Sequence, residues 1–332
     1  MISTIPLFFS LVFLTLLPMI CNELRLRAGI QVFLIASIFF ITIVLLYFSL
    51  RLGTDFDSYV SVINILRSDD PAMLSAGWAL HEVIFWGLIQ IYSYFILDEE
   101  MVVKLLSITT LFLVLLAYLF NRQPNSRFFF ISIFCSFYAV SASINAVRLG
   151  LAIALTLSII QLFPSKARFL TLILPLAHTS LMVITLIAYP AIIFIIGIIF
   201  FTTGSSIDSL IYVEEKIKSY SDSTLVSFFA IALLFVGNLC LIWSLKKWYS
   251  RTVFIAAIGI SSFAFIYSFY SYLGIRIQGL LPIMICFWAA ISNFTDAIFL
   301  RIMRHPGFRL AIIIYAVISI RSLVVQMFYQ EM

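Results

Sequence analysis

Residues 29–50 read GIQVFLIASIFFITIVLLYFSL and contain no charged side chain. About 20 apolar residues in a helix cross the ~30 Å hydrocarbon layer of a bilayer, so this stretch predicts a membrane-spanning helix. We expect such helices at residues 2–20, 29–50, 101–120, 128–143, 144–163, 187–203, 225–245, 252–270, 277–296 and 310–327. Two further apolar stretches, 76–97 and 169–186, fit either a span or a segment that does not cross.

The composition leads to the same class. Of the 332 residues, 63% are hydrophobic and 11% are charged, whereas soluble proteins are about half apolar and a quarter charged. This excludes a soluble domain, a disordered chain and a disulfide-rich secreted scaffold. The polar gaps at 51–75 and 204–224 are too short for domains of their own. We therefore predict one all-α integral membrane domain over 1–332, with about 10–12 transmembrane helices, one or two re-entrant or interfacial helices, and these two gaps as external loops.

The net charge of +5 indicates membrane topology rather than nucleic-acid binding, because Lys and Arg accumulate in cytoplasmic loops. Five short loops are basic: Arg25/Arg27, Arg122/Arg127, Lys166/Arg168, Lys246/Lys247/Arg251 and Arg301/Arg304/Arg309. All five fall on one side if 76–97 and 169–186 enter the membrane and return, or lie on its surface. That arrangement has ten crossings with both termini outside. If both segments cross, the basic residues divide evenly between the two sides.

No metal or cofactor motif is present. The four cysteines occur singly, at Cys21, Cys135, Cys240 and Cys286, without the paired spacing of a metal site or a disulfide framework. We interpret them as small buried hydrophobic residues and expect neither a metal nor a cofactor.

Polar residues follow the second apolar stretch. A capping-box-like start at Thr54 predicts a helix that continues to about Arg67. In that helix Asp55 and Tyr59 are four residues apart and share a face, with Arg51 just before it. Alternatively, the acidic residue complements the helix dipole and Arg51 extends to the membrane interface.

A second polar group, Asn145 and Arg148, lies at the junction of two apolar stretches, with Ala152 one turn later on the same face. A cation near hydrocarbon costs about 2.5–3.5 kcal/mol on insertion scales, so such a residue usually faces a cavity or a partner. Extension of Arg148 from a loop to the interface is the alternative.

Two further residues are candidates. Pro175 and Pro190 bracket an apolar run that contains His178, which fits a broken or re-entrant hairpin; a hydrogen-bonded core histidine is the alternative. Arg276 is expected in a loop at 270–276 on the same face as 51–75, unless it is an arginine extending from a helix end.

These residues predict an anion site on the external face. Arginine pairs phosphate oxygens bidentately and stays charged, so Arg51, Arg148 and Arg276 suit a phosphate-bearing headgroup. Asp55 is a candidate general base. Aromatic residues near this face, such as Tyr272, either stack on sugar rings or belong to the interfacial aromatic belt.

The order of these motifs resembles the EpsG-like and Wzy-type polysaccharide polymerases. That family has R-x-G-x-D-x-x-x-Y after the second helix, N-x-x-R-x-x-x-A in mid-chain, and H-x-S about thirty residues later. The matching residues here are Arg51/Gly53/Asp55/Tyr59, Asn145/Arg148/Ala152 and His178/Ser180. The resemblance covers roughly residues 40–190.

The resemblance implies a polymerase of O-antigen or capsular/exopolysaccharide repeat units. Such an enzyme transfers a growing glycan from undecaprenyl pyrophosphate to an incoming lipid-linked unit, on the external face of the bacterial plasma (inner) membrane. A GT-C-like architecture and a chain-length regulator membrane protein as partner are also implied. In this reading the catalytic residues are Asp55, Arg148 and His178, and the substrate-binding residues are Arg51, Tyr59, Asn145, Tyr272 and Arg276.

Two other functions compete with this one. A flippase of lipid-linked sugars also needs a basic cavity and many helices, although such transporters often show duplicated halves, which we do not find. A membrane acyltransferase would need an acidic partner for His178. We also expect a metal-independent enzyme, because arginines can neutralise the pyrophosphate.

Overall fold

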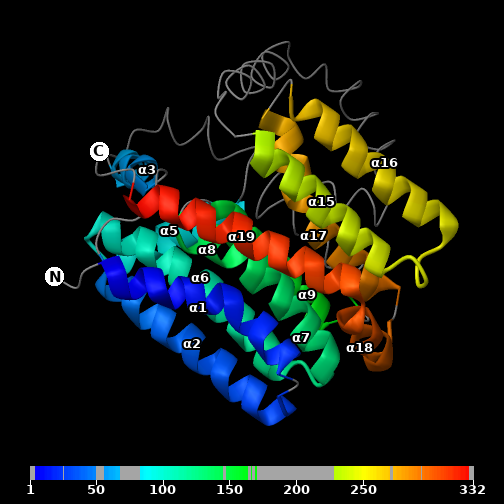
Figure 1. Ribbon diagram of the computed structural model, residues 1–332. Helices are drawn as coiled ribbons and strands as arrows, with labels where there is room; N and C mark the ends of the chain where they lie inside the picture. The colour runs from blue at the N-terminus through cyan, green and yellow to red at the C-terminus, as the bar shows by residue number, and fades with distance from the viewer. Residues whose placement is uncertain are drawn as a thin grey trace.

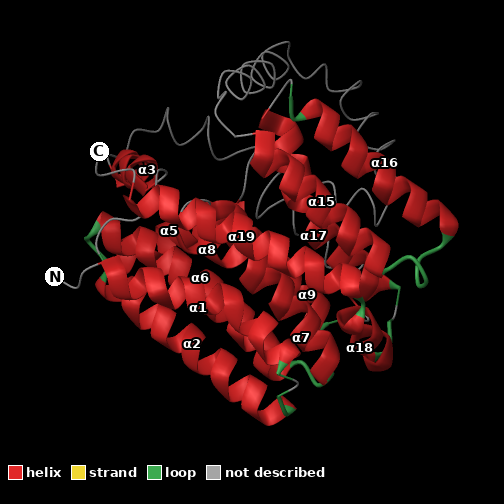
Figure 2. Ribbon diagram, viewed as in Figure 1, coloured by secondary structure: helices red, strands yellow, loops and turns green. Residues whose placement is uncertain are grey.

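The computed structural model describes residues 4–24, 26–49, 56–67, 83–144, 147–163, 166, 169, 228–269, 272–292 and 294–328. Within these ranges every regular element is a helix and none is a strand (Figure 2), which confirms the all-α prediction. The helices are α1 (Thr4–Glu23), α2 (Ala28–Phe48), α3 (Phe56–Arg67), α5 (Val83–Phe95), α6 (Glu99–Phe120), α7 (Pro124–Ile133), the π-helix η1 (Phe134–Tyr138), α8 (Ala139–Ile144), α9 (Val147–Leu162), α15 (Phe228–Ser244), α16 (Arg251–Tyr267), α17 (Tyr272–Ile291), α18 (Asp296–Arg304) and α19 (Pro306–Phe328).

Five helices in this part of the chain are long and apolar enough to cross a membrane: α1, α2, α6, the continuous helix Pro124–Ile144 made of α7, η1 and α8, and α19 up to Gln326. Large apolar side chains point outward from α2, where Phe33 is 70% exposed and Phe40 is 65% exposed. A soluble surface rarely carries so much contiguous apolar area. The chain is therefore an all-α polytopic membrane protein, as predicted.

One end of the bundle, which we call the basic end, brings together the end of α1 and the starts of α7, α18 and α19. Arg309 of α19 pairs with Glu23 of α1 at 3.3 Å, and Asp296 of α18 accepts a hydrogen bond from the Asn125 backbone of α7 at 2.8 Å. Figure 1 shows this end at the lower right, around α18. The described basic residues of the five loops are Arg27, Arg122, Arg127, Lys166, Lys246, Lys247, Arg251, Arg301, Arg304 and Arg309. They belong to the segments that join these helix ends, and their side of the membrane stays a prediction.

The opposite end, which we call the site end, holds the end of α2 and the start of α6. Nζ of Lys104 donates a hydrogen bond to the Ser49 carbonyl oxygen at 2.5 Å. The start of α6 therefore lies at the same end of the bundle as the end of α2, and whether 76–97 crosses the membrane stays a prediction. The start of α1 and the end of α19 also lie at this end (Figure 1). The second such segment, 169–186, lies outside the described residues.

Buried polar side chains satisfy backbone groups of α17 at the point where Pro282 interrupts the hydrogen bonding of the helix. Pro282 has no N–H, so the carbonyl of Gln278 loses its helical donor. Nδ2 of Asn238 in α15 donates to that carbonyl at 3.1 Å, and the hydroxyl of Tyr315 in α19 donates to Oδ1 of Asn238 at 2.8 Å. These bonds join α15, α17 and α19.

Tyr138 of η1 contributes a second bridge to the same interruption. Its hydroxyl donates to the Gly279 carbonyl at 2.7 Å and accepts from the Ile283 N–H at 3.2 Å. In an unbroken helix these two backbone groups would pair with each other, so the tyrosine hydroxyl takes the place of a helical bond. The bridge fixes α17 against the continuous helix Pro124–Ile144.

Candidate functional site

The site end contains a separate hydrophobic cluster on which the candidate site is built. Tyr59 of α3 is 8% exposed and Phe85 of α5 is fully buried, and both belong to this cluster with residues of α6 and α9. The two ring centroids lie 5.8 Å apart with the planes tilted by 55°, a separation at which aromatic pairs attract. The short helices α3 and α5 are thereby held against the bundle.

Arg148, in the first turn of α9, lies over both of these rings. Its guanidinium carbon is 5.9 Å from the Tyr59 ring centroid and 6.0 Å from the Phe85 ring centroid. Each distance is within the range of a cation–π interaction. A guanidinium group can contact rings through its face and still donate hydrogen bonds along its edges, so these ring contacts hold the arginine in place at the site end.

Gly150 determines how closely α9 approaches the preceding helix. A Cβ at this position would lie 2.5 Å from both Cα and Cβ of Ala142 in α8. Only glycine therefore allows the observed spacing between α8 and α9. Since Arg148 is two residues away on the same helix, this contact also sets the position of its guanidinium group.

Lys104 places a second cation at the site end. It lies in the second turn of α6, is partly buried, and donates to the Ser49 carbonyl oxygen. Lys104 lines a crevice between α2, α3, α6, α8 and α9 together with Tyr59, Ser107 and Ser143. The cation at Lys104 is thus next to the tyrosine over which Arg148 lies.

The crevice itself is small. Its volume of about 10 Å³ is near the minimum of ~10–15 Å³ that one water molecule needs. The crevice between the described residues is therefore too small to hold a whole substrate. Two cations and two aromatic rings lie in it or beside it.

The structure brings together two of the residues that the sequence predicted, Tyr59 and Arg148. The helix predicted from the capping box is present as α3, and the junction predicted near Asn145 separates α8 from α9. Four predicted site residues lie outside the described residues: Arg51, Asp55, Asn145 and His178.

The predicted loop around Arg276 is wrong. Tyr272 and Arg276 both belong to the first turns of α17. Within this stretch, Gly274 packs against the backbone of Ser268 and Ala264 at the end of α16. Glycine is required there because two helix ends approach closely.

Lys104 and Phe85 were not predicted as site residues. Lys104 is the one charged residue within the stretch 101–120, and this was the signal that could have identified it. A lysine one turn from a helix end is usually interpreted as extending to the interface. Phe85 carries no such signal, because its role depends on the packing of α5 against α3.

Comparison with known proteins adds no family assignment. The chain matches no family model, no curated protein and no solved structure. In the part of the chain that the structure describes, no group of three or more His, Cys, Asp or Glu side chains is arranged to hold a metal ion.

Proposed function

We propose that the protein is a membrane glycosyltransferase that polymerises lipid-linked oligosaccharide repeat units. The observation that supports this most is the meeting of Tyr59 and Arg148 beside Lys104, at the end of the bundle away from the basic loops. Two of the family-like motifs thereby contribute to one place. The substrate would be a glycan on undecaprenyl pyrophosphate, and the acceptor a second lipid-linked unit.

The proposed reaction needs positive charge more than any other feature. An acceptor hydroxyl oxygen attacks the anomeric carbon of the growing glycan, and the bond from that carbon to the pyrophosphate oxygen breaks. The electron pair leaves with the pyrophosphate, and the hydroxyl proton passes to a base. Arg148 and Lys104 would stabilise the charge that develops on the leaving group, which fixed cations do best in a site of low dielectric constant.

The remaining roles come from the sequence motifs. Asp55, which directly precedes α3 in the sequence, is the proposed base, and His178 would orient the pyrophosphate or share a proton. Arg51, Asn145 and Arg276 would bind substrate, with Tyr272 stacking on a sugar ring. These assignments are tested by substitution at each position.

The proposed orientation follows from the charge distribution. Because basic loops remain on the cytoplasmic side, the basic end would face the cytoplasm and the site end would face the exterior, in a bacterial plasma membrane. Polymerisation of exported repeat units takes place on that external face. A GT-C-like architecture belongs to the same proposal.

The glycan pattern of a deletion strain tests this function. Loss of a polymerase leaves a single repeat unit on its final acceptor, and expression of the intact gene should restore the long chains. Loss of a flippase would leave no repeat unit on the acceptor, which would contradict the proposal in favour of transport. Long chains of normal length in the deletion strain would contradict both functions.

A further inference from the structure

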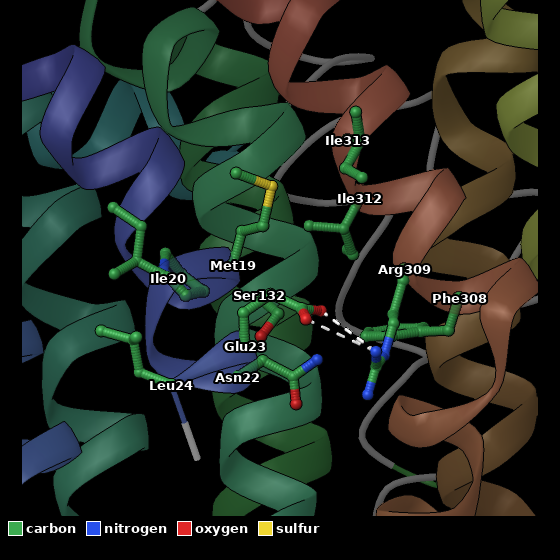
Figure 3. Close-up of a pocket in the computed structure, with 11 residues that line it drawn as sticks. Met19, Ile20, Asn22, Glu23, Leu24, Ser132, Phe308, Arg309, Ile312 and Ile313 are labelled. Atoms are coloured by element: carbon green, nitrogen blue, oxygen red, sulfur yellow. Dashed lines mark hydrogen bonds and ion pairs between the residues drawn. The ribbon is translucent and has the colours of Figure 1, made fainter. Parts of the chain in front are cut away.

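A groove at the basic end, on the far side of the bundle from Arg148, has the form of a lipid site. The groove lies between α1, α7 and α19. Its volume of about 430 Å³ is within the ~300–1,000 Å³ range of pockets that hold small ligands. Figure 3 shows Met19, Ile312 and Ile313 along its apolar part. Since α1 and α19 are both apolar enough to span a membrane, this surface would face acyl chains in a bilayer.

A pair of opposite charges lies at the polar end of the groove. Nη1 of Arg309 is 3.3 Å from Oε1 and 3.5 Å from Oε2 of Glu23, as the dashed lines in Figure 3 show. The side chain of Arg309 is 36% exposed and that of Glu23 is 52% exposed. Both charged groups are thus accessible to a ligand that enters the groove.

Arg309 can act as a donor to a ligand in the groove. Its side chain is 36% exposed beside Glu23, and a phosphate oxygen is the acceptor that guanidinium groups pair with most readily. The groove therefore combines an apolar channel, a donor suited to phosphate and an adjacent carboxylate.

We propose that this groove binds a phospholipid with a primary-ammonium zwitterionic headgroup, of the phosphatidylethanolamine type. One acyl chain occupies the apolar part, the phosphate pairs with Arg309, and the ammonium group pairs with Glu23. An anionic headgroup such as phosphatidylglycerol satisfies the arginine equally well but places no positive charge on the carboxylate. Charge complementarity therefore selects the zwitterionic lipid.

Native mass spectrometry of the purified full chain tests this, with phosphatidylethanolamine and phosphatidylglycerol of identical acyl chains added at equal concentration. Because a half-exposed ion pair contributes up to about 1 kcal/mol, we expect a roughly three- to fivefold preference for phosphatidylethanolamine. Glu23→Gln should abolish the preference, and Arg309→Gln should weaken binding of both lipids. Arg304→Gln, an exposed cation of the same end outside the groove, is the matched control and should change neither.

A second substitution tests the location. Ile313 lines the groove and is 43% exposed, so Ile313→Trp should fill the groove and lower the uptake of both lipids without disturbing the core. Arg148→Ala should bind lipid as the wild type does, since it lies at the other end. Equal affinity for the two lipids in the wild-type protein, or an unchanged preference in Glu23→Gln, would contradict the proposed headgroup. Full binding by Ile313→Trp would contradict the proposed groove.

Discussion

Replacement of Gly150 by alanine adds one methyl group between α8 and α9. In the structure that carbon would lie 2.5 Å from Cα and Cβ of Ala142. Non-bonded carbon atoms are most stable at about 3.5–4.0 Å, so the two helices must separate by roughly 1 Å. Neither clashing atom can rotate away, because one is backbone and the other is a Cβ.

The consequence for stability and the consequence for activity have different sizes. Overpacking of this kind typically costs about 1–3 kcal/mol of the free energy of unfolding. The movement of α9 also carries Arg148 away from the rings of Tyr59 and Phe85. A displacement of about 1 Å in a positioning group can lower a catalytic rate by ~100-fold, so we expect glycan elongation to fall more than protein accumulation does.

The assay compares Gly150→Ala with Gly259→Ala, which adds the same methyl group to helix α16 where nothing lies within 4 Å. Denaturant unfolding in detergent should show lower stability for Gly150→Ala and equal or higher stability for Gly259→Ala, since alanine favours helix by about 1 kcal/mol over glycine. Glycan ladders from membranes with matched protein levels measure elongation. Wild-type stability together with a wild-type ladder in Gly150→Ala would refute the packing argument.

Three further substitutions test separate parts of the structure. Tyr138→Phe removes the hydroxyl that bridges α17 at Pro282, and it should cost about 1–3 kcal/mol of the free energy of unfolding. The control is Tyr94→Phe at an exposed position, which should cost less than ~0.5 kcal/mol. Equal effects of the two substitutions would contradict the bridge. Asp296→Ala removes the carboxylate that accepts from the first N–H groups of α7 and should cost about 0.5–2 kcal/mol in the same unfolding experiment; unchanged stability would mean that water replaces the carboxylate. Lys104→Met keeps the length of the side chain but removes a charge-assisted donor whose hydrogen bond contributes ~1.5–3 kcal/mol. Glycan elongation should therefore fall about tenfold or more, while the amount of protein in the membrane stays unchanged. A full-length glycan ladder would exclude Lys104 from the site.

Much of the fold could be predicted because apolar length and charge position are local properties of the chain. The stretch at 29–50 corresponds to α2, and the polar junction near Asn145 separates two helices. The expected position of the basic loops rested only on the tendency of Lys and Arg to remain on one side. That tendency also favoured an arrangement in which 76–97 makes no net crossing, and the bond from Lys104 to Ser49 places the start of α6 at the same end of the bundle as the end of α2.

Tyr59 and Arg148 were each predicted as site residues, but their contact was not. Arg148 stood out because a cation near hydrocarbon is costly without a partner, and Tyr59 because it shares a helix face with Asp55 and matches a family-like motif. The sequence could not identify the partner rings or the second cation, because Phe85 is one of 34 phenylalanines and Lys104 fitted an interfacial lysine. These assignments depend on the packing of α3 and α5 onto α6, which no local pattern encodes.

Two features depend on contacts that no local sequence pattern predicts. The hydroxyl that bridges the interruption of α17 at Pro282 comes from Tyr138, far away in the chain. Gly274 lies in the stretch 270–276 that was expected to form a loop, and it permits close contact between the start of α17 and the end of α16.

Elongation by purified protein in vesicles tests the central claim most directly. The wild type, Arg148→Ala and Arg148→Lys are each reconstituted with lipid-linked repeat units, and the length of the lipid-linked glycan is measured over time. We expect the wild type to elongate and Arg148→Ala to produce none. Arg148→Lys should be strongly impaired, because an ammonium group lacks the planar fork that stacks and binds phosphate together. Elongation by Arg148→Ala at the wild-type rate would contradict the account.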